Sequence, residues 1–139
     1  MNWIAWSLLS ALFAGVTAIL AKQGVTHIPS NLAMAIRTTV IFAVAWAVVL
    51  ASGPPAAIAK VDRRGLLFLV LSGGTTGLSW LCYFRALQVG EASRVAPLDK
   101  LSVVFVVLFA ALFLGERLTF LSAAGVLLIA AGAILLTFA

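Results

Sequence analysis

The stretch WIAWSLLSALFAGVTAILA, residues 3–21, is nineteen residues long, contains no charged side chain and is followed by Lys22. About 20 helical residues cross the hydrocarbon core of a bilayer, so this stretch is long enough to span one. The apolar core of a signal peptide is shorter, about 7–15 residues, and follows positive charges. We therefore expect a retained membrane helix, with Trp3 and Trp6 near one interface and Lys22 near the other.

Four more apolar stretches of similar length follow, and together the five take up most of the 139 residues. Backbone polar groups cannot stay unpaired in lipid, and none of the stretches alternates apolar with polar residues as a barrel strand does. The predicted fold is therefore all-α, a polytopic membrane protein that forms a single domain over residues 1–139. Its five transmembrane helices are expected at about residues 3–21, 32–51, 65–88, 94–114 and 119–138.

The composition excludes several classes of function. Hydrophobic residues make up 64% of the chain and charged residues 9%, against about 25% in soluble domains. The net charge of +5 comes from basic residues at the ends of apolar runs, where they meet lipid headgroups, so we expect the bilayer and no nucleic acid as partner. A single cysteine, Cys82, and a single histidine, His27, give no metal site and no activated nucleophile. We expect neither an enzyme nor a cofactor.

Five is an odd number of spans, so the two ends of the chain are expected on opposite sides of the membrane. Five helices are few for enclosing a pathway, and two copies would supply ten. Positive charges are nearly balanced between the two sides, which leaves open one preferred orientation or insertion in both orientations with antiparallel pairing. The side of the N-terminus holds Lys60, Arg63, Arg64 and Arg117, and the other side holds Lys22, Arg85 and Arg94, with Arg37 and Lys100 deeper.

Charged residues inside the spans are costly in lipid and are commonly functional. Arg37, Asp99 and Lys100 lie inside two spans, and for them we favour a polar pathway over a purely structural ion-pair network. Arg85 lies nearer a helix end, where a long basic side chain can extend to the headgroups. Asp99 and Lys100 are neighbours, about 100° apart on a helix, so they are not each other's best partner, and Asp99 could instead meet Arg37 or Arg85 from a neighbouring helix.

Aromatic and small residues suggest two further features. Trp80, Tyr83 and Phe84 cluster near one end of the third predicted span, either as an interfacial belt or as the wall of a pocket for an apolar or cationic substrate. Glycines at small-residue spacing allow close helix–helix packing. The candidate helix-packing residues are Gly73, Gly77, Gly125 and Gly132.

Several segments together resemble the EamA domain of the drug/metabolite transporter superfamily. They include AGVTAILAK at residues 14–22, AIR at 35–37, YFRAL at 83–87 and LGERL at 114–118. The resemblance covers essentially the whole chain and rests on the order and spacing of these segments. In this family Glu116 belongs to the last motif, and its place in a tight link suits a structural cap better than a substrate contact.

The resemblance implies a fold and a function. Family members usually carry two five-helix repeats of opposite orientation, and this sequence carries one. It implies half of a ten-helix inverted-repeat transporter, completed by an antiparallel homodimer with dual topology in a bacterial or archaeal plasma (inner) membrane. The last helix would be a dimer contact, and the third and fourth helices would line the cavity, which makes Trp80, Tyr83, Asp99 and Lys100 pathway candidates.

We therefore expect a secondary transporter of small organic metabolites or drugs, working by alternating access. The pathway candidates are Arg37, Trp80, Tyr83, Arg85, Asp99 and Lys100. Asp99 is also the candidate for proton coupling, because a carboxylate in low dielectric takes up a proton more readily. The alternative is a non-transporting accessory or scaffold subunit of a larger membrane complex, suggested by the single repeat and the small-residue face of residues 119–138.

Overall fold

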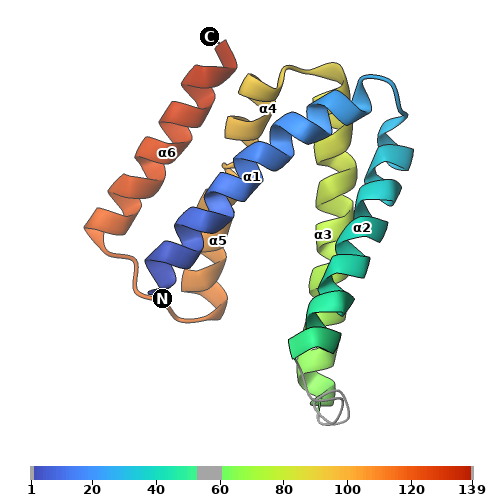
Figure 1. Ribbon diagram of the computed structural model, residues 1–139. Coiled ribbons are helices and arrows are strands. Elements are labelled where there is room, and N and C mark those ends of the chain that lie inside the picture. The colour runs from blue at the N-terminus through green and yellow to red at the C-terminus, as the bar shows by residue number, and fades with distance from the viewer. Residues whose placement is uncertain (1, 53–60, 139) are drawn as a thin grey trace. The chain divides into compact units, whose positions relative to one another are not determined.

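The computed structural model describes residues 2–52 and 61–138, and within these ranges every regular element is a helix (Figure 1). Residues 53–60, which include Lys60, lie outside the described residues. The helices, in chain order, are α1 (Trp3–Val25), α2 (Ser30–Ser52), α3 (Arg63–Val89), α4 (Ala92–Asp99), α5 (Ser102–Phe113) and α6 (Phe120–Phe138).

Within the described ranges, five segments are long and apolar enough to cross a membrane, and α4 and α5 together form one of them, a span of 22 residues over Ala92–Phe113. The predicted all-α fold with five membrane-spanning helices is therefore confirmed. The helices extend somewhat beyond the predicted limits: α1 continues past Lys22 to Val25, and α3 begins at Arg63 instead of Gly65. Polar residues therefore form the ends of these helices, outside their apolar middle.

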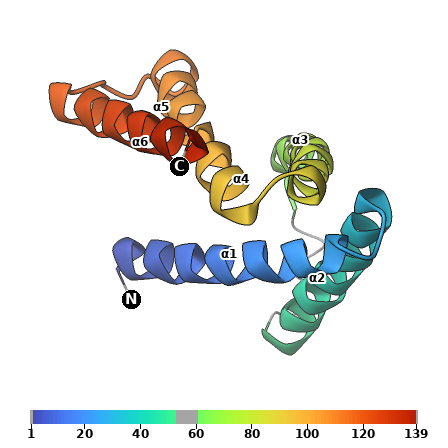
Figure 2. The same cartoon turned by 90° about the horizontal axis from the view of Figure 1, so that it is seen from above.

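The fourth span is broken, whereas the sequence predicts one continuous helix over residues 94–114. After Pro97 the backbone changes to three-residue spacing: Lys100 N–H donates to the Pro97 carbonyl at 3.0 Å, and Leu101 N–H donates to the Leu98 carbonyl at 3.0 Å. Proline has no N–H to donate and disturbs a helix interior, and tighter turns of this type mark interruptions. α4 ends at Asp99 and α5 begins at Ser102, so the break lies directly after Asp99. Both elements are labelled in Figure 2.

The link after α5 depends on one glycine. Gly115 has a φ of 68°, in the left-handed region that side chains with a Cβ avoid. The next residue, Glu116, donates its N–H back to the Ala110 carbonyl at 3.2 Å. The backbone of Glu116 thus helps to close the end of α5.

The described residues divide into two compact units. Residues 21–88 comprise the end of α1 with α2 and α3, and their most buried side chains are Val25, Phe84 and Leu87. Residues 2–20 and 89–138 comprise the rest of α1 with α4, α5 and α6, and here α6 packs against α4 and α5.

Apolar side chains cover the spans on most sides. Phe113 is 79% exposed and Phe120 is 92% exposed in the isolated chain. A helix that is apolar around its whole circumference is typical of a membrane span, because lipid then covers what a soluble core would otherwise bury. The exposed apolar surface thus supports a chain embedded in a bilayer.

Candidate functional site

Arg37 is the charged residue that lies deepest in the unit of residues 21–88. It is the eighth residue of α2, about 10 Å from the start of that helix at 1.5 Å per residue. The only acidic residue of this unit is Asp62. Asp62 lies at the beginning of α3, where its Oδ2 accepts the Gly65 N–H at 3.2 Å. Trp80 is eighteen residues further along α3, about 27 Å away, so Asp62 is not the counter-charge of Arg37.

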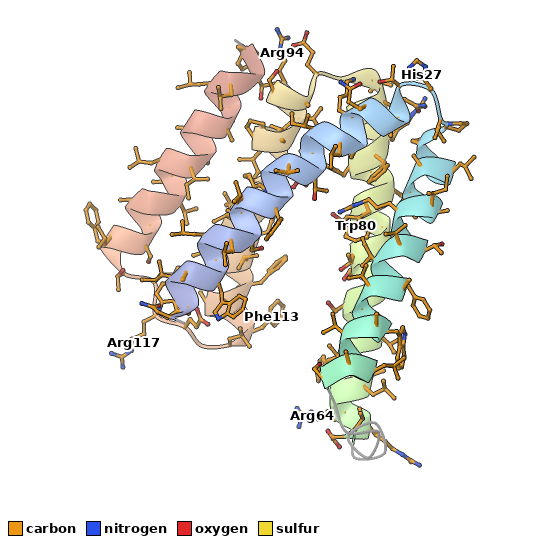
Figure 3. The ribbon with its side chains drawn as sticks, viewed as in Figure 1. His27, Arg64, Trp80, Arg94, Phe113 and Arg117 are labelled. Atoms are coloured by element: carbon orange, nitrogen blue, oxygen red, sulfur yellow. The ribbon has the colours of Figure 1, made fainter. Side chains whose placement is uncertain are left out.

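Two aromatic rings of α3 hold the Arg37 cation. Its Cζ lies 4.3 Å from the centroid of the Trp80 ring and 5.5 Å from that of Phe84. Trp80 and Phe84 are four residues apart and therefore share one helix face. Phe84 is 2% exposed, and Trp80 can be located on α3 in Figure 3. A partly buried contact of this kind stabilises by about 1 kcal/mol, which offsets part of the cost of a charge in the membrane.

The neighbouring residues of α3 are engaged in different ways. Tyr83 is half-buried and lies close enough to Arg37 to interact with it electrostatically. Arg85 Nη1 donates to Gln88 Oε1 at 2.8 Å, so this arginine bonds along its own helix near the helix end. Arg37, Trp80, Phe84 and Tyr83 thus form one cluster, defined here as the Arg37 cluster, and Arg85 interacts separately.

Asp99 and Lys100 lie in the other unit, at the break between α4 and α5. Asp99 Oδ2 and Lys100 Nζ form an ion pair at 3.7 Å. The sequence argument that these neighbours are not each other's best partner assumes a regular helix. In the structure Asp99 ends α4 and Lys100 belongs to a turn, so the 100° spacing does not apply. Both side chains remain substantially exposed, at 39% for Asp99 and 58% for Lys100.

Local partners also account for charges at the helix ends. Arg94 Nε lies 3.1 Å from Glu91 Oε2 in an exposed pair one helical turn apart. Lys22 Nζ donates to the Leu87 carbonyl at 2.7 Å and so caps the end of α3. The sequence predicts Lys22 at a membrane interface but gives no sign that the Leu87 carbonyl is its acceptor, because the two residues are 65 positions apart.

The four helix-packing glycines have open space beside them. A Cβ built on Gly73, Gly77, Gly125 or Gly132 would meet no atom within 4 Å. The packing role predicted for them therefore stays a prediction, and any partner helix has room to approach. In the described ranges, no group of three or more His, Cys, Asp or Glu residues could hold a metal ion.

These observations define a class: a multi-pass membrane protein with an arginine held on aromatic rings within one span and an ion pair at the break of another. Residues 1–138 match the model of the EamA-like transporter family, and the chain belongs to this family. It is therefore a membrane transporter, as the sequence resemblance predicts.

Two named relatives agree with this assignment. An uncharacterised transporter from Sinorhizobium sp, described by its place in the cobO 3′ region, is 54% identical over 135 residues, which cover 97% of this chain and 96% of the relative. The pseudopaline exporter CntI of Pseudomonas aeruginosa is 38% identical over 58 residues, which cover 42% of this chain and 20% of that protein. No solved structure is significantly similar to the chain.

Proposed function

We propose that this protein is a secondary transporter that moves small organic metabolites or drugs by alternating access. The observation that carries the proposal is the match over residues 1–138 to a transporter family. The Sinorhizobium relative adds support, since it is named a transporter and shares 96% of its length with this chain.

The transporting unit is proposed to be an antiparallel homodimer. Five spans leave residues 2 and 138 on opposite sides of the membrane, and transporters of inverted-repeat architecture place the substrate between two oppositely oriented halves. A second copy inserted the other way would supply the second half. The open space beside Gly125 and Gly132 leaves room for a helix of that copy against α6.

The polar residues within the spans are the proposed pathway. Broken membrane helices commonly form substrate or ion sites in transporters. The break after Asp99 therefore supports a pathway role for Asp99 and Lys100. Protonation of Asp99 would neutralise its carboxylate and release the Lys100 ammonium, which gives a means of coupling proton movement to substrate movement. Arg37, Trp80, Tyr83 and Arg85 are the proposed contacts on α2 and α3.

Flux in proteoliposomes tests this function. Purified protein is reconstituted with an imposed pH gradient, and uptake of a radiolabelled panel of amino acids, their N-acetyl derivatives and organic amines is followed. We expect proton-driven uptake of at least one class, and we expect Asp99→Asn to lower it at least about tenfold because the variant cannot exchange a proton. The matched control is Asp62→Asn, which changes a carboxylate at the start of α3, and it should transport like the wild type.

Normal proton-driven uptake by a folded Asp99→Asn variant would reject the coupling role of Asp99. Crosslinking separates the transporter from an accessory subunit. Antiparallel homodimers formed by the protein alone in membranes support transport. Monomers that crosslink only to a different membrane protein support the subunit and would reject the proposed homodimer.

A further inference from the structure

The Arg37 cluster has an excess of positive charge that its own unit does not neutralise. Arginine stays protonated at all physiological pH values, and residues 21–88 contain no acidic residue other than the distant Asp62. A charge at this depth of α2 requires compensation. Trp80 and Phe84 provide part of it through their ring faces.

The rings leave the hydrogen-bonding capacity of Arg37 unused. A guanidinium has five N–H donors in one plane, and a contact with a ring face satisfies none of them in that plane. Within residues 21–52 and 61–88, no hydrogen bond to the Arg37 guanidinium is present. The aromatic contact also orients the group, so less side-chain freedom would be lost when an acceptor binds.

A planar anion fits this arrangement best. A carboxylate accepts two parallel N–H bonds from the edge of a guanidinium, and such charge-assisted pairs are roughly twice as strong as neutral hydrogen bonds. A cationic substrate does not fit, because the protein's own cation already lies on the Trp80 ring and would repel a second one. The sequence alone left apolar and cationic substrates open for these aromatics, and the observed contact removes the cationic alternative at this cluster.

The surroundings define the rest of the ligand. Val40 and Ile41 follow Arg37 by three and four residues on α2, so they share its helix face, and they are 58% and 38% exposed. A ligand near Arg37 would therefore place an apolar or aromatic body against apolar groups and direct its negative group to the guanidinium.

We propose that Arg37, held by Trp80 and Phe84, is the binding residue for the carboxylate of a small apolar or aromatic organic acid. This inference rests on the proposed transport function, since it names the substrate class of that function. It makes Arg37 a substrate contact, and Trp80 and Phe84 positioning residues that hold its guanidinium.

The test compares two probes that differ only in charge, N-acetylphenylalanine and N-acetylphenylalaninamide. Binding of each probe to purified full-length protein is measured by equilibrium dialysis. We expect the wild type to bind the carboxylate at least about tenfold more tightly than the amide, the difference of one charge-assisted pair. Arg37→Gln should remove this preference, and Arg37→Lys should retain only part of it because lysine cannot form the two parallel bonds.

The matched control is Arg64→Gln, which removes a positive charge at the start of α3 and should keep the full preference. Folding of each variant is checked by helical circular dichroism and by monodispersity in detergent. Equal binding of both probes by the wild type would overturn the inference, and this comparison needs no variant. If the folded Arg37→Gln variant still bound the carboxylate more tightly than the amide, the inference would also be overturned. Arg37 would then serve only to connect α2 and α3.

Flux of the same two probes in proteoliposomes separates this inference from the proposed function. Preferential binding without flux of any probe would leave the anion site in place and reject transport. Flux of the carboxylate and the amide at equal rates, unchanged in Arg37→Gln, would support transport and reject the anion site.

Discussion

At the residue scale, Lys22 connects two helix ends of one unit. The last carbonyls of an α-helix have no partner within the helix, and a cation beside them is favourable. Lys22, in the last turn of α1, donates to one of these carbonyls, Leu87 of α3, at 2.7 Å. The contact holds the end of α1 against the end of α3, close to the three α3 residues of the Arg37 cluster.

Replacement of Lys22 tests the strength of this contact. Lys22→Met keeps the length and apolar stem of the side chain but cannot donate, and we expect a loss of about 1 kcal/mol in unfolding free energy. The measurement is thermal unfolding in detergent, followed by intrinsic fluorescence. Arg94→Met is the control, since its ion pair with Glu91 is exposed and such pairs contribute a few tenths of a kcal/mol. Equal shifts in the two variants would contradict the capping role.

Single residues of the site could be found from sequence, but their partners could not. Arg37 stands out because a charge within an apolar run is costly, and Trp80 and Phe84 stand out by their four-residue spacing. The sequence offers Arg37 or Arg85 as a partner for Asp99, and the contacts of Arg37 within its own unit are with aromatic rings. Whether an acidic side chain or aromatic rings compensate the charge of Arg37 depends on how α2 and α3 pack against each other. The spacing of residues along the sequence does not contain that information.

At the scale of elements, all five spans follow from the sequence, because length and absence of charge directly measure the ability to cross a bilayer. The break after Asp99 does not follow in the same way. Pro97 is visible in the sequence, but the apolar run continues to Leu114, and the sequence therefore favours a continuous helix. The hydrogen bonds at the break join residues three apart in the sequence instead of four. This is a property of the backbone, and the length of an apolar run does not predict it.

Restoring the helix tests the role of the break. Pro97→Ala removes the ring from the helix interior and supplies an N–H for the Ser93 carbonyl, so a regular helix becomes more favourable on both sides of residue 97. We therefore expect α4 and α5 to join and the amides of Lys100 and Leu101 to exchange hydrogen more slowly. Because the break is proposed to serve the pathway, flux in proteoliposomes should fall severalfold while thermal stability is equal or higher. Both effects are measured on the same preparation, by exchange mass spectrometry and by uptake.

The control for this variant is Pro29→Ala, which removes a proline that directly precedes α2 and lies outside any helix interior. It should leave both uptake and the exchange of Lys100 unchanged. Slowed exchange together with unchanged uptake in Pro97→Ala would show that transport does not need the interruption.

At the scale of the whole molecule, family membership and five spans establish a membrane transporter, and the proposed assembly adds an oppositely oriented second copy. Sequence indicates this assembly only indirectly, through an odd number of spans and nearly balanced charges. Described positive residues occur at both ends of the spans: Arg63 begins α3 and Arg117 follows α5, whereas Lys22 lies in the last turn of α1 and Arg94 near the start of α4. The orientation of the chain in the membrane depends on small differences between the numbers of Lys and Arg residues on the two sides. These numbers are nearly equal here, so the sequence leaves the orientation undecided.

The most direct test is the location of both termini in one cell population. Single cysteines are placed at Asn2 and at Thr137 in a Cys82→Ser background, and intact cells are labelled with a membrane-impermeant thiol reagent. Antiparallel pairing predicts that each position is labelled from outside in about half of the copies, since five spans put the two positions on opposite sides. Labelling of one position in nearly all copies and of the other in none would contradict the antiparallel homodimer.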